Sequence, residues 1–577
     1  MRLFERRLHR AILPILFAVP ILAVLAASPT SGKSKARPAD LFVTSDKCQA
    51  CHNNLAVQAG EDLSIGVAWR ATMMAHSAVD PYWRAGVRRE VLDHPEAAAA
   101  IEDKCSTCHM PMARYTREQM GLGGRVLDDP ATPLAFAGGP RSAAALDGVS
   151  CAVCHQILGD NLQSEESFTG GFEVDAAAEP GERPVYGPFE VARATRRIMS
   201  SASGFEPREG AHVQSAELCA TCHTLYTHPL DGEGNAIGEF PEQVPYLEWL
   251  HSDYAAGRVD PRSCQDCHMQ TARGETPVSS VLGPPRSDVS KHSFRGGNFT
   301  VLRLLGEHRH ELGARALPAE LDLSVRNTVD HLEAEAATIV IAGDGIDLAG
   351  GVLSADVAVE NLAGHKLPTA YPSRRVWIHL AVTDADGQTL FESGALGPDG
   401  AIAGNDNDRD GGSFEPHHGV ISSADQVQIY EAVMQTVDGR VTTGLMEAFS
   451  YAKDSRLLPK GFDKRSADPD VAVHGAALDD ESFTEGRDRV RYEIEVGEIE
   501  GPLTVTAELW YQPVGYRWAQ NLAEYDAAEP AAFVRMYEAL PGADTALLLA
   551  RAEAVVEPPT PEPTATDSHA PGDTGAK

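Results

Sequence analysis

The stretch Cys151-Ala152-Val153-Cys154-His155 decides how this chain folds, because its pattern, Cys-x-x-Cys-His, occurs five times and uses all ten cysteines. The other copies are Cys48-Cys51-His52, Cys105-Cys108-His109, Cys219-Cys222-His223 and Cys264-Cys267-His268. Two thiols at this spacing bond to the vinyl groups of one porphyrin, and the adjacent histidine reaches the iron. Motifs 1 to 5, numbered along the chain, therefore predict five covalently bound haem c groups with these five histidines as proximal iron ligands.

Other uses of paired cysteines fit this pattern poorly. Zinc ribbons need pairs of Cys-x-x-Cys knuckles to complete four ligands, and five knuckles cannot be paired. A thioredoxin-like redox motif occurs once and needs no following histidine. Structural disulfides do not require a histidine at a fixed offset either. The sequence therefore favours haem attachment over these three readings.

The N-terminus predicts export. Arg2, Arg6, Arg7 and Arg10 precede an apolar run over residues 11–26, and small residues follow at Ala27 and Ser28. This order is typical of a secretory signal peptide, here residues 1–27, and it indicates the periplasm or outer surface of a bacterium. An uncleaved leader that anchors the chain in the membrane is the alternative, although the run is shorter than a comfortable span.

The net charge of the chain limits the classes of partner that it can bind. The formal net charge is −34, which disfavours nucleic acid through like-charge repulsion. Electrostatic steering would favour positively charged redox partners, such as basic cytochromes, and a quinol-oxidising membrane complex is a further candidate. The alternative is that acidity only keeps an exported protein soluble.

Motif spacing predicts one haem-rich unit over residues 41–325. Successive motifs begin 57, 46, 68 and 45 residues apart. Segments of this length cannot each bury a core of their own, so we expect the porphyrins to supply much of the apolar interior. Short helices, long loops and closely packed haems follow from this expectation.

The second half predicts a β-sandwich-like domain over residues 336–525, which makes the chain an α+β multidomain protein. A connecting helix is expected over 323–335. Strands rich in β-branched and aromatic residues are expected at 338–341, 352–359, 376–382, 427–434, 490–496 and 503–511. A second helical segment is expected over 527–556, packed on the haem unit, and residues 557–577 read as a disordered tail.

The sixth ligand of each iron separates an electron carrier from an enzyme with an open haem. His76, His212 and His292 are the first candidates, and His228 and His365 come next. His76 follows motif 1 in a helical-looking segment, His212 precedes motif 4, and glycines after His292 permit close approach to a porphyrin. Weaker candidates are His94, His251, His308, His310 and the thioethers of Met73, Met74, Met110 and Met269.

The N-terminal part resembles the multihaem cytochrome c superfamily that includes the tetrahaem electron acceptor of hydroxylamine oxidation. The residues that carry the resemblance are 47–52 with 69–76, 215–224 and 296–298. It implies that His76 is an axial ligand. The segment 364–375 resembles an element of multihaem proteins with an appended β-domain, which implies that His365 faces a haem across the domain boundary.

The chain departs from the catalytic branches of this superfamily. Pentahaem nitrite reductases bind their catalytic haem through a lysine variant of the motif, whereas all five copies here end in histidine. Octahaem hydroxylamine-oxidising enzymes need more motifs. Both differences favour electron carriage.

Asp406, Asp408 and Asp410, followed by Gly411, match the first half of a calcium-binding loop. The position that should carry a bidentate glutamate is His417, so a solvated acidic loop is the alternative.

Three functions therefore compete. The first is an electron relay between redox partners of the cell envelope. The second is an oxidoreductase with one open haem that acts on a small nitrogen or sulfur compound. In the third, the β-domain binds a partner while the haem unit docks to a donor.

Overall fold

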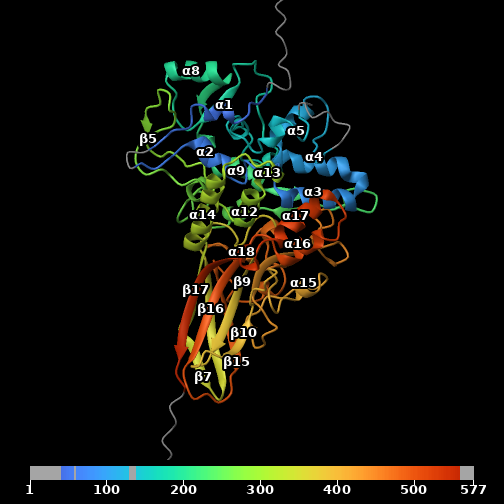
Figure 1. Ribbon diagram of the computed structural model, residues 1–577, viewed down its shortest axis with the longest axis vertical. Coiled ribbons are helices and arrows are strands. Elements are labelled where there is room, and N and C mark those ends of the chain that lie inside the picture. Colours follow the sequence, from blue (N-terminus) through green and yellow to red (C-terminus); the bar gives the residue numbers. More distant parts are fainter. Residues whose placement is uncertain (1–40, 57–59, 129–137, 559–577) are drawn as a thin grey trace, which may run out of the picture.

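The computed structural model describes residues 41–56, 60–128 and 138–558. The predicted signal peptide and nearly all of the predicted tail lie outside these residues. Figure 1 shows an N-terminal helical unit at one end of an elongated molecule and a β-domain at the other, with the long helix α14 (Pro318–Glu335) and the C-terminal helices between them.

The N-terminal unit consists of short helices, short strand pairs and long loops. Its helices are α1 (Asp46–Gln49), α2 (Ile65–Arg70), α3 (Pro81–Asp93), α4 (Ala98–His109), α5 (Pro111–Glu118), α6 (Ala143–Leu146), α7 (Cys151–Cys154), α8 (Arg193–Ser203), α9 (Ala216–His223), α10 (Pro245–Leu250), α11 (Cys264–His268), α12 (Phe299–Glu307) and α13 (Arg309–Leu312). Its strands are β1 (Pro184–Gly187), β2 (Glu206–Glu209), β3 (Leu225–Thr227), β4 (Phe240–Gln243), β5 (Thr276–Pro277) and β6 (Pro285–Arg286), paired in that order.

Each Cys-x-x-Cys-His motif overlaps one helix of this unit. Motifs 2, 4 and 5 end at the last residue of α4, α9 and α11, and motifs 1 and 3 begin within α1 and α7. Ser263 caps α11, where its hydroxyl accepts from the backbone N–H of Asp266. A helical turn places the two thiols and the histidine of each motif on neighbouring positions, as attachment to one porphyrin requires.

The β-domain is a sandwich of two sheets. One sheet has the order β11 (Val420–Ile421), β15 (Arg487–Glu495), β8 (Val352–Asn361) and β7 (Ala337–Ala349). The other has the order β13 (Val441–Thr442), β12 (Ile429–Gln435), β9 (Arg375–Thr383), β16 (Leu503–Gln512) and β17 (Leu547–Val556), with β10 (Thr389–Ser393) on β9 and β14 (Ser450–Asp454) on β12. Alternate residues of β15 and β16 are buried, and they join one core between the sheets.

All six predicted strands lie within or across strands of the structure, and the predicted mixture of helices and sheets is confirmed. The reason is the strength of the local pattern. Period-two alternation of β-branched and aromatic residues commits one face of each strand to the core, so a shift of one residue would expose that face.

The prediction of a helical segment over 527–556 is wrong in its second half. Helices α16 (Tyr516–Leu522) and α17 (Ala528–Glu538) pack on α3 and α12, where Phe533 contacts Tyr82. After the short helix α18 (Gly542–Thr545), however, the chain forms β17, which pairs antiparallel with β16. The alanines of β17 favour a helix in isolation, but the open edge of β16 offers backbone hydrogen bonds that a local pattern does not reveal.

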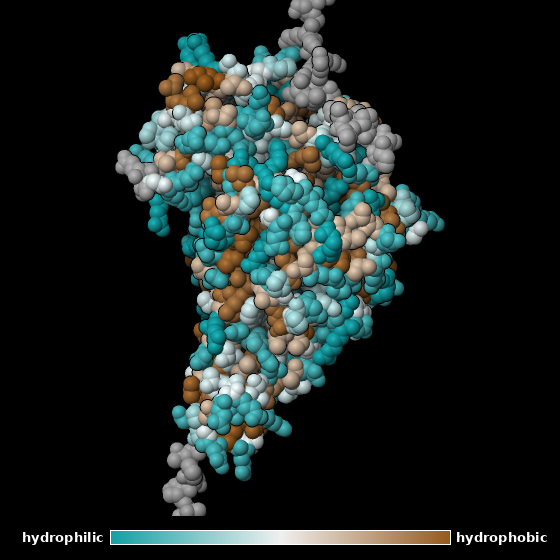
Figure 2. All heavy atoms as spheres, viewed as in Figure 1, coloured by the Kyte–Doolittle hydropathy of each residue, from teal (hydrophilic) through white to brown (hydrophobic). Residues whose placement is uncertain are grey.

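The face drawn in Figure 2 interleaves hydrophobic and hydrophilic residues over both ends of the molecule. Within the described ranges, no helix has both the length and the apolar character that a membrane crossing requires.

Glu242, on β4, gives the stability of the fold a pH dependence. Burial raises the pKa of this carboxyl to about 8, whereas an unfolded glutamate has a pKa of about 4.3. Folded Glu242 therefore stays protonated where the unfolded chain is ionised, and the free energy of unfolding should fall as pH rises between these values. The loss is on the order of a few kcal/mol.

The variant Glu242→Gln should remove this pH dependence. We expect it to match the parent protein near pH 4.5 and to exceed its unfolding free energy at pH 8.5, measured by chemical denaturation. Glu233→Gln, at an exposed position, is the matched control. An equal decline with pH in the parent and in Glu242→Gln would contradict the assignment.

Candidate metal centres

The fold brings thiols of different motifs into contact. The thiol of Cys48 in motif 1 hydrogen-bonds that of Cys151 in motif 3, which lowers the pKa of Cys48. The same kind of contact joins motif 2 to motif 4 and motif 4 to motif 5, through the pairs Cys108–Cys222 and Cys219–Cys264. These contacts join motif 1 to motif 3, and motif 2 to motifs 4 and 5. Cys154 of motif 3 also lies close enough to Cys219 and Cys222 of motif 4 to add to their raised pKa, which connects the two groups.

The thiols and imidazoles of this group are partly enclosed by the surrounding protein. All ten cysteines are unpaired and have intermediate exposure, yet burial raises the pKa of Cys154 to about 11. His223 is exposed by area, while burial lowers its pKa. Neighbouring protein therefore shields these side chains, although some of their surface stays accessible.

The proximal histidines are held in the orientation that a metal ligand needs. Nδ1 of His52, His155 and His268 donates to the backbone carbonyls of residues 278, 186 and 295, at 2.6, 2.6 and 2.5 Å. Nδ1 of His109 donates to the carbonyl of Ser77 at 3.3 Å. Such bonds fix the tautomer and leave Nε2 unprotonated for a metal. Burial lowers the pKa of His109 and His268 to about 4, which keeps both rings neutral.

His292 faces the proximal histidine of motif 3 at the spacing of an iron atom. The ring centres of His155 and His292 are 6.3 Å apart, and their planes differ by 19°. Two metal–nitrogen bonds of about 2 Å and two imidazole radii of about 1.2 Å would separate the centres by about 6.4 Å. Nδ1 of His292 donates to the carbonyl of Ser290 at 3.0 Å, so its Nε2 is also available.

His365 faces the proximal histidine of motif 5 across the domain boundary. The ring centres of His268 and His365 are 6.2 Å apart, with planes 13° from parallel. Nδ1 of His365 donates to the carbonyl of Lys366 at 2.9 Å. The spacing again fits one iron between the two rings, with one ligand from each half of the chain.

A buried ion cluster holds the His365 loop against the N-terminal unit. Lys366 pairs with Asp454 at 2.6 Å, and Arg456 bridges Asp454 and Glu248 at 2.7 Å each. Glu248, on α10, also accepts from the backbone N–H of Lys366 at 3.1 Å. All four side chains are at most 6 % exposed. Two cations and two anions cancel in charge, and the cluster joins the two domains next to His365.

The other predicted sixth ligands occupy different positions. His76 is buried, and its Nδ1 donates to the carbonyl of Thr72 at 2.9 Å, which leaves Nε2 without a hydrogen bond. His212 has the opposite orientation, because its Nε2 lies 2.9 Å from the carbonyl of Ile157. His228 is exposed, with Nδ1 3.2 Å from the carbonyl of Gly238. None of these three rings lies opposite a proximal histidine within the described chain.

Two further histidines have features of possible ligands: one that the sequence did not single out and one that it placed among the weaker candidates. His331, on α14, has its ring centre 6.0 Å from that of His268. His94, which the sequence placed among the weaker candidates, has a buried Nε2 without a partner. The signal for His331 was available in the sequence, since helix 318–335 directly precedes the β-domain, but only tertiary packing places it beside motif 5.

The calcium prediction is not supported by the geometry. Asp408 is buried and pairs with Arg375 at 2.8 Å, and its second oxygen accepts from the backbone N–H of Ile402. Asp406 begins the helical turn α15 (Asp406–Arg409), and Asp410 accepts from the N–H of Gly412. The three carboxylates are therefore engaged separately and do not surround one position.

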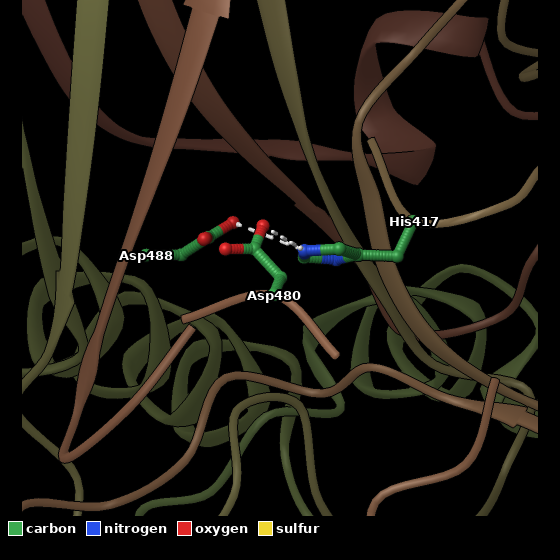
Figure 3. A group of neighbouring side chains, drawn as sticks. All are labelled: His417, Asp480 and Asp488. Atoms are coloured by element: carbon green, nitrogen blue, oxygen red, sulfur yellow. Dashed lines mark hydrogen bonds and ion pairs between the residues drawn. The ribbon is translucent and has the colours of Figure 1, made fainter. Parts of the chain in front are cut away.

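His417, Asp480 and Asp488 form a compact group in the β-domain (Figure 3). Nε2 of His417 lies 3.1 Å from Asp480 and 4.0 Å from Asp488. Gln428 accepts from the N–H of His418 through its oxygen, so its amide NH₂ points at Nδ1 of His417, 2.7 Å away. Nδ1 is thus an acceptor and Nε2 carries the proton, which makes this group a hydrogen-bonded network rather than a metal site.

One solved structure resembles the chain over most of its length. The penta-haem cytochrome c552 from Thermochromatium tepidum matches 90 % of this chain and 100 % of its own, with a TM-score of 0.50 and 16 % sequence identity. The two chains share a fold. No family model matches the sequence, and a search of curated proteins finds no match. The likeness covers the β-domain as well as the motif-bearing unit, since nine tenths of the chain is aligned.

His292 offers a direct test of the pairing at motif 3. Replacing it with alanine should leave one iron without its sixth ligand, so one haem should change from low to high spin at unchanged haem content. Electron paramagnetic resonance (EPR) of the oxidised protein measures this change. His228→Ala, at an exposed histidine, is the matched control and should leave the spectrum unaltered. A fully low-spin spectrum of His292→Ala would contradict the pairing.

Proposed function

We propose that the protein is an exported pentahaem c-type cytochrome that relays electrons between redox partners of a bacterial envelope. The ten thiols would hold five haem c groups, and the five motif histidines would be their proximal ligands. Haem supplies one-electron chemistry at the iron. The chain's own residues attach it, fix the imidazole tautomers and exclude water from the interior.

The main support for this proposal comes from two histidine pairs, His155–His292 and His268–His365. In each pair the ring centres are separated by the distance that one iron atom between them would require. Two histidines leave an iron no open position, so such a centre passes electrons without binding a substrate. Contacts between thiols of motifs 1 and 3, 2 and 4, and 4 and 5 support close packing of neighbouring haems. Two closed centres, at motifs 3 and 5, among motifs whose thiols lie close together suit a relay.

The test is EPR of the oxidised, purified protein, together with haem content from the pyridine haemochrome. We expect five haems per chain and low-spin signals. Potentials should be spread and mostly low, because bis-histidine ligation lacks the methionine that raises the potential. A chain that binds no haem, or five haems with uniformly high potentials, would overturn the proposal.

A second candidate function is an oxidoreductase with one open haem. Within the described residues, no histidine ring faces His52, His109 or His223 at iron spacing. Of these three histidines, His223 is the most exposed; burial lowers its pKa, and Arg374 lies close enough to lower it further. A high-spin signal of one haem that shifts with small nitrogen or sulfur ligands would favour this function over a relay.

The proposed partners are positively charged redox proteins, since the chain carries a net charge of −34. Basic cytochromes and a quinol-oxidising membrane complex are the classes to test. Encounter with a basic cytochrome should slow as ionic strength rises, because screening weakens electrostatic steering.

A further inference from the structure

Two histidines compete for one position at motif 5. The ring centre of His268 lies 6.2 Å from that of His365 and 6.0 Å from that of His331. An iron bound to His268 has one axial position left, so only one of the two rings can occupy it. The rings differ in orientation, since the plane of His365 is 13° from that of His268 and the plane of His331 is 74° from it.

His365 and His331 differ in how strongly hydrogen bonds fix their rings. Nδ1 of His365 donates to the carbonyl of Lys366 at 2.9 Å, and Lys366 is fixed in the buried ion cluster. Nδ1 of His331 lies 3.4 Å from Glu335, at the outer limit of a hydrogen bond, and has no other partner. The ring of His365 is therefore fixed in one orientation, whereas the ring of His331 can rotate without losing a strong hydrogen bond.

Glu335 connects His331 to the proximal side of the same centre. Its carboxylate pairs with Arg295 at 3.1 Å. Arg295 in turn donates to the carbonyl of Cys267, and its own carbonyl accepts from Nδ1 of His268. A carboxylate behind Nδ1 directs Nε2 of a histidine toward a metal and raises its basicity, so Glu335 suits His331 for ligation.

We propose that His331 is a reserve sixth ligand of the iron at motif 5 and that His365 is the ligand in the resting protein. The inference rests on the proposed function, because it requires haem at motif 5. If His365 were displaced or removed, Nε2 of His331 would ligate the iron at motif 5 in place of Nε2 of His365. One iron–nitrogen bond breaks and one forms, with no change in protons or electrons.

After this exchange, the iron at motif 5 would still have a histidine at its sixth position. Because either half of the chain can supply the ligand, movement of the β-domain loop does not open the iron to small molecules. It would change the angle between the planes of His268 and its opposite ligand from the 13° of His365 toward the 74° of His331. These two arrangements split the iron d orbitals differently, and they give low-spin EPR signals of different shape.

The experiment uses the full-length holoprotein and the variants His365→Gln, His331→Gln and the double variant, with His310→Gln, at an exposed position on α13, as control. Glutamine keeps polarity and approximate size. EPR gives spin state and signal shape, and the pyridine haemochrome gives haem content. We expect His365→Gln to stay low-spin while the signal of one haem changes shape. His331→Gln and the control should match the parent, and the double variant should show one high-spin haem.

Three results would overturn the inference. A high-spin haem in His365→Gln alone would show that His331 does not ligate. A high-spin haem in His331→Gln alone would make His331 the resting ligand, and a low-spin double variant would place another group on the iron. If His365→Gln loses haem, measuring the parent protein after mild loosening of the β-domain by denaturant gives the same readout. Fewer than five haems in the parent itself would instead count against the proposed function.

Discussion

Without haem attachment, residues 41–316 should fail to form a protease-resistant structure, while the β-domain core should persist. Around the motifs, the described part of this unit buries small apolar clusters of four to nine residues, and its larger cluster depends on packing against the C-terminal helices α16 and α17. The β-domain, by contrast, holds nearly all of one cluster of thirty-five buried residues. Small separate cores do not offset the conformational entropy of so many loops, so the covalent porphyrins must supply the missing contacts.

The measurement is limited proteolysis of protein made with and without the haem-attachment machinery. We expect the haem-free chain to be degraded to a fragment that begins near α14 and includes the C-terminal strand β17. The loaded protein is the control and should resist the same protease along both domains. Equal resistance of both preparations would show that the N-terminal unit folds by itself and would remove the structural role assigned to the cofactors.

Replacing Asp454 with alanine should destabilise the protein by about 3–5 kcal/mol, because it leaves Lys366 and Arg456 buried with a single carboxylate between them. The measurement is the free energy of unfolding by chemical denaturation. The matched control is Glu360→Gln, which breaks the exposed pair with Arg487 at 3.5 Å and should change stability by at most about 1 kcal/mol. Equal effects of the two variants would contradict the assignment.

The same cluster has a defined pH dependence. Burial alone would raise the pKa of Asp454, but Arg456 and Lys366 together hold it well below its usual range. Its stabilising contribution is therefore complete above the unfolded pKa of about 3.9 and is lost only as pH falls through the depressed folded value. The difference in stability between the parent protein and Asp454→Ala should persist at pH 4 and shrink in stronger acid.

Much of the architecture follows from local sequence. Five Cys-x-x-Cys-His motifs predict the haem-attachment sites, because attachment chemistry depends on residues within one helical turn. Alternating β-branched residues predicted strands such as β8, β9 and β16 because the period of two is local as well. The connecting helix, predicted over 323–335, has the same origin and begins slightly earlier, at Pro318.

Only tertiary structure decided which residues meet. The approach of His365 to His268, the presence of His331 beside them and the ion cluster around Asp454 all join segments distant in the chain. Tertiary structure also decided the strand β17, whose residues favour a helix in isolation. It likewise decided the role of Asp408, because the ion pair with Arg375 prevents this carboxylate from joining a calcium loop. Local periodicity records which face of an element is buried, but the partner of a buried polar group is fixed by the packing of elements against each other.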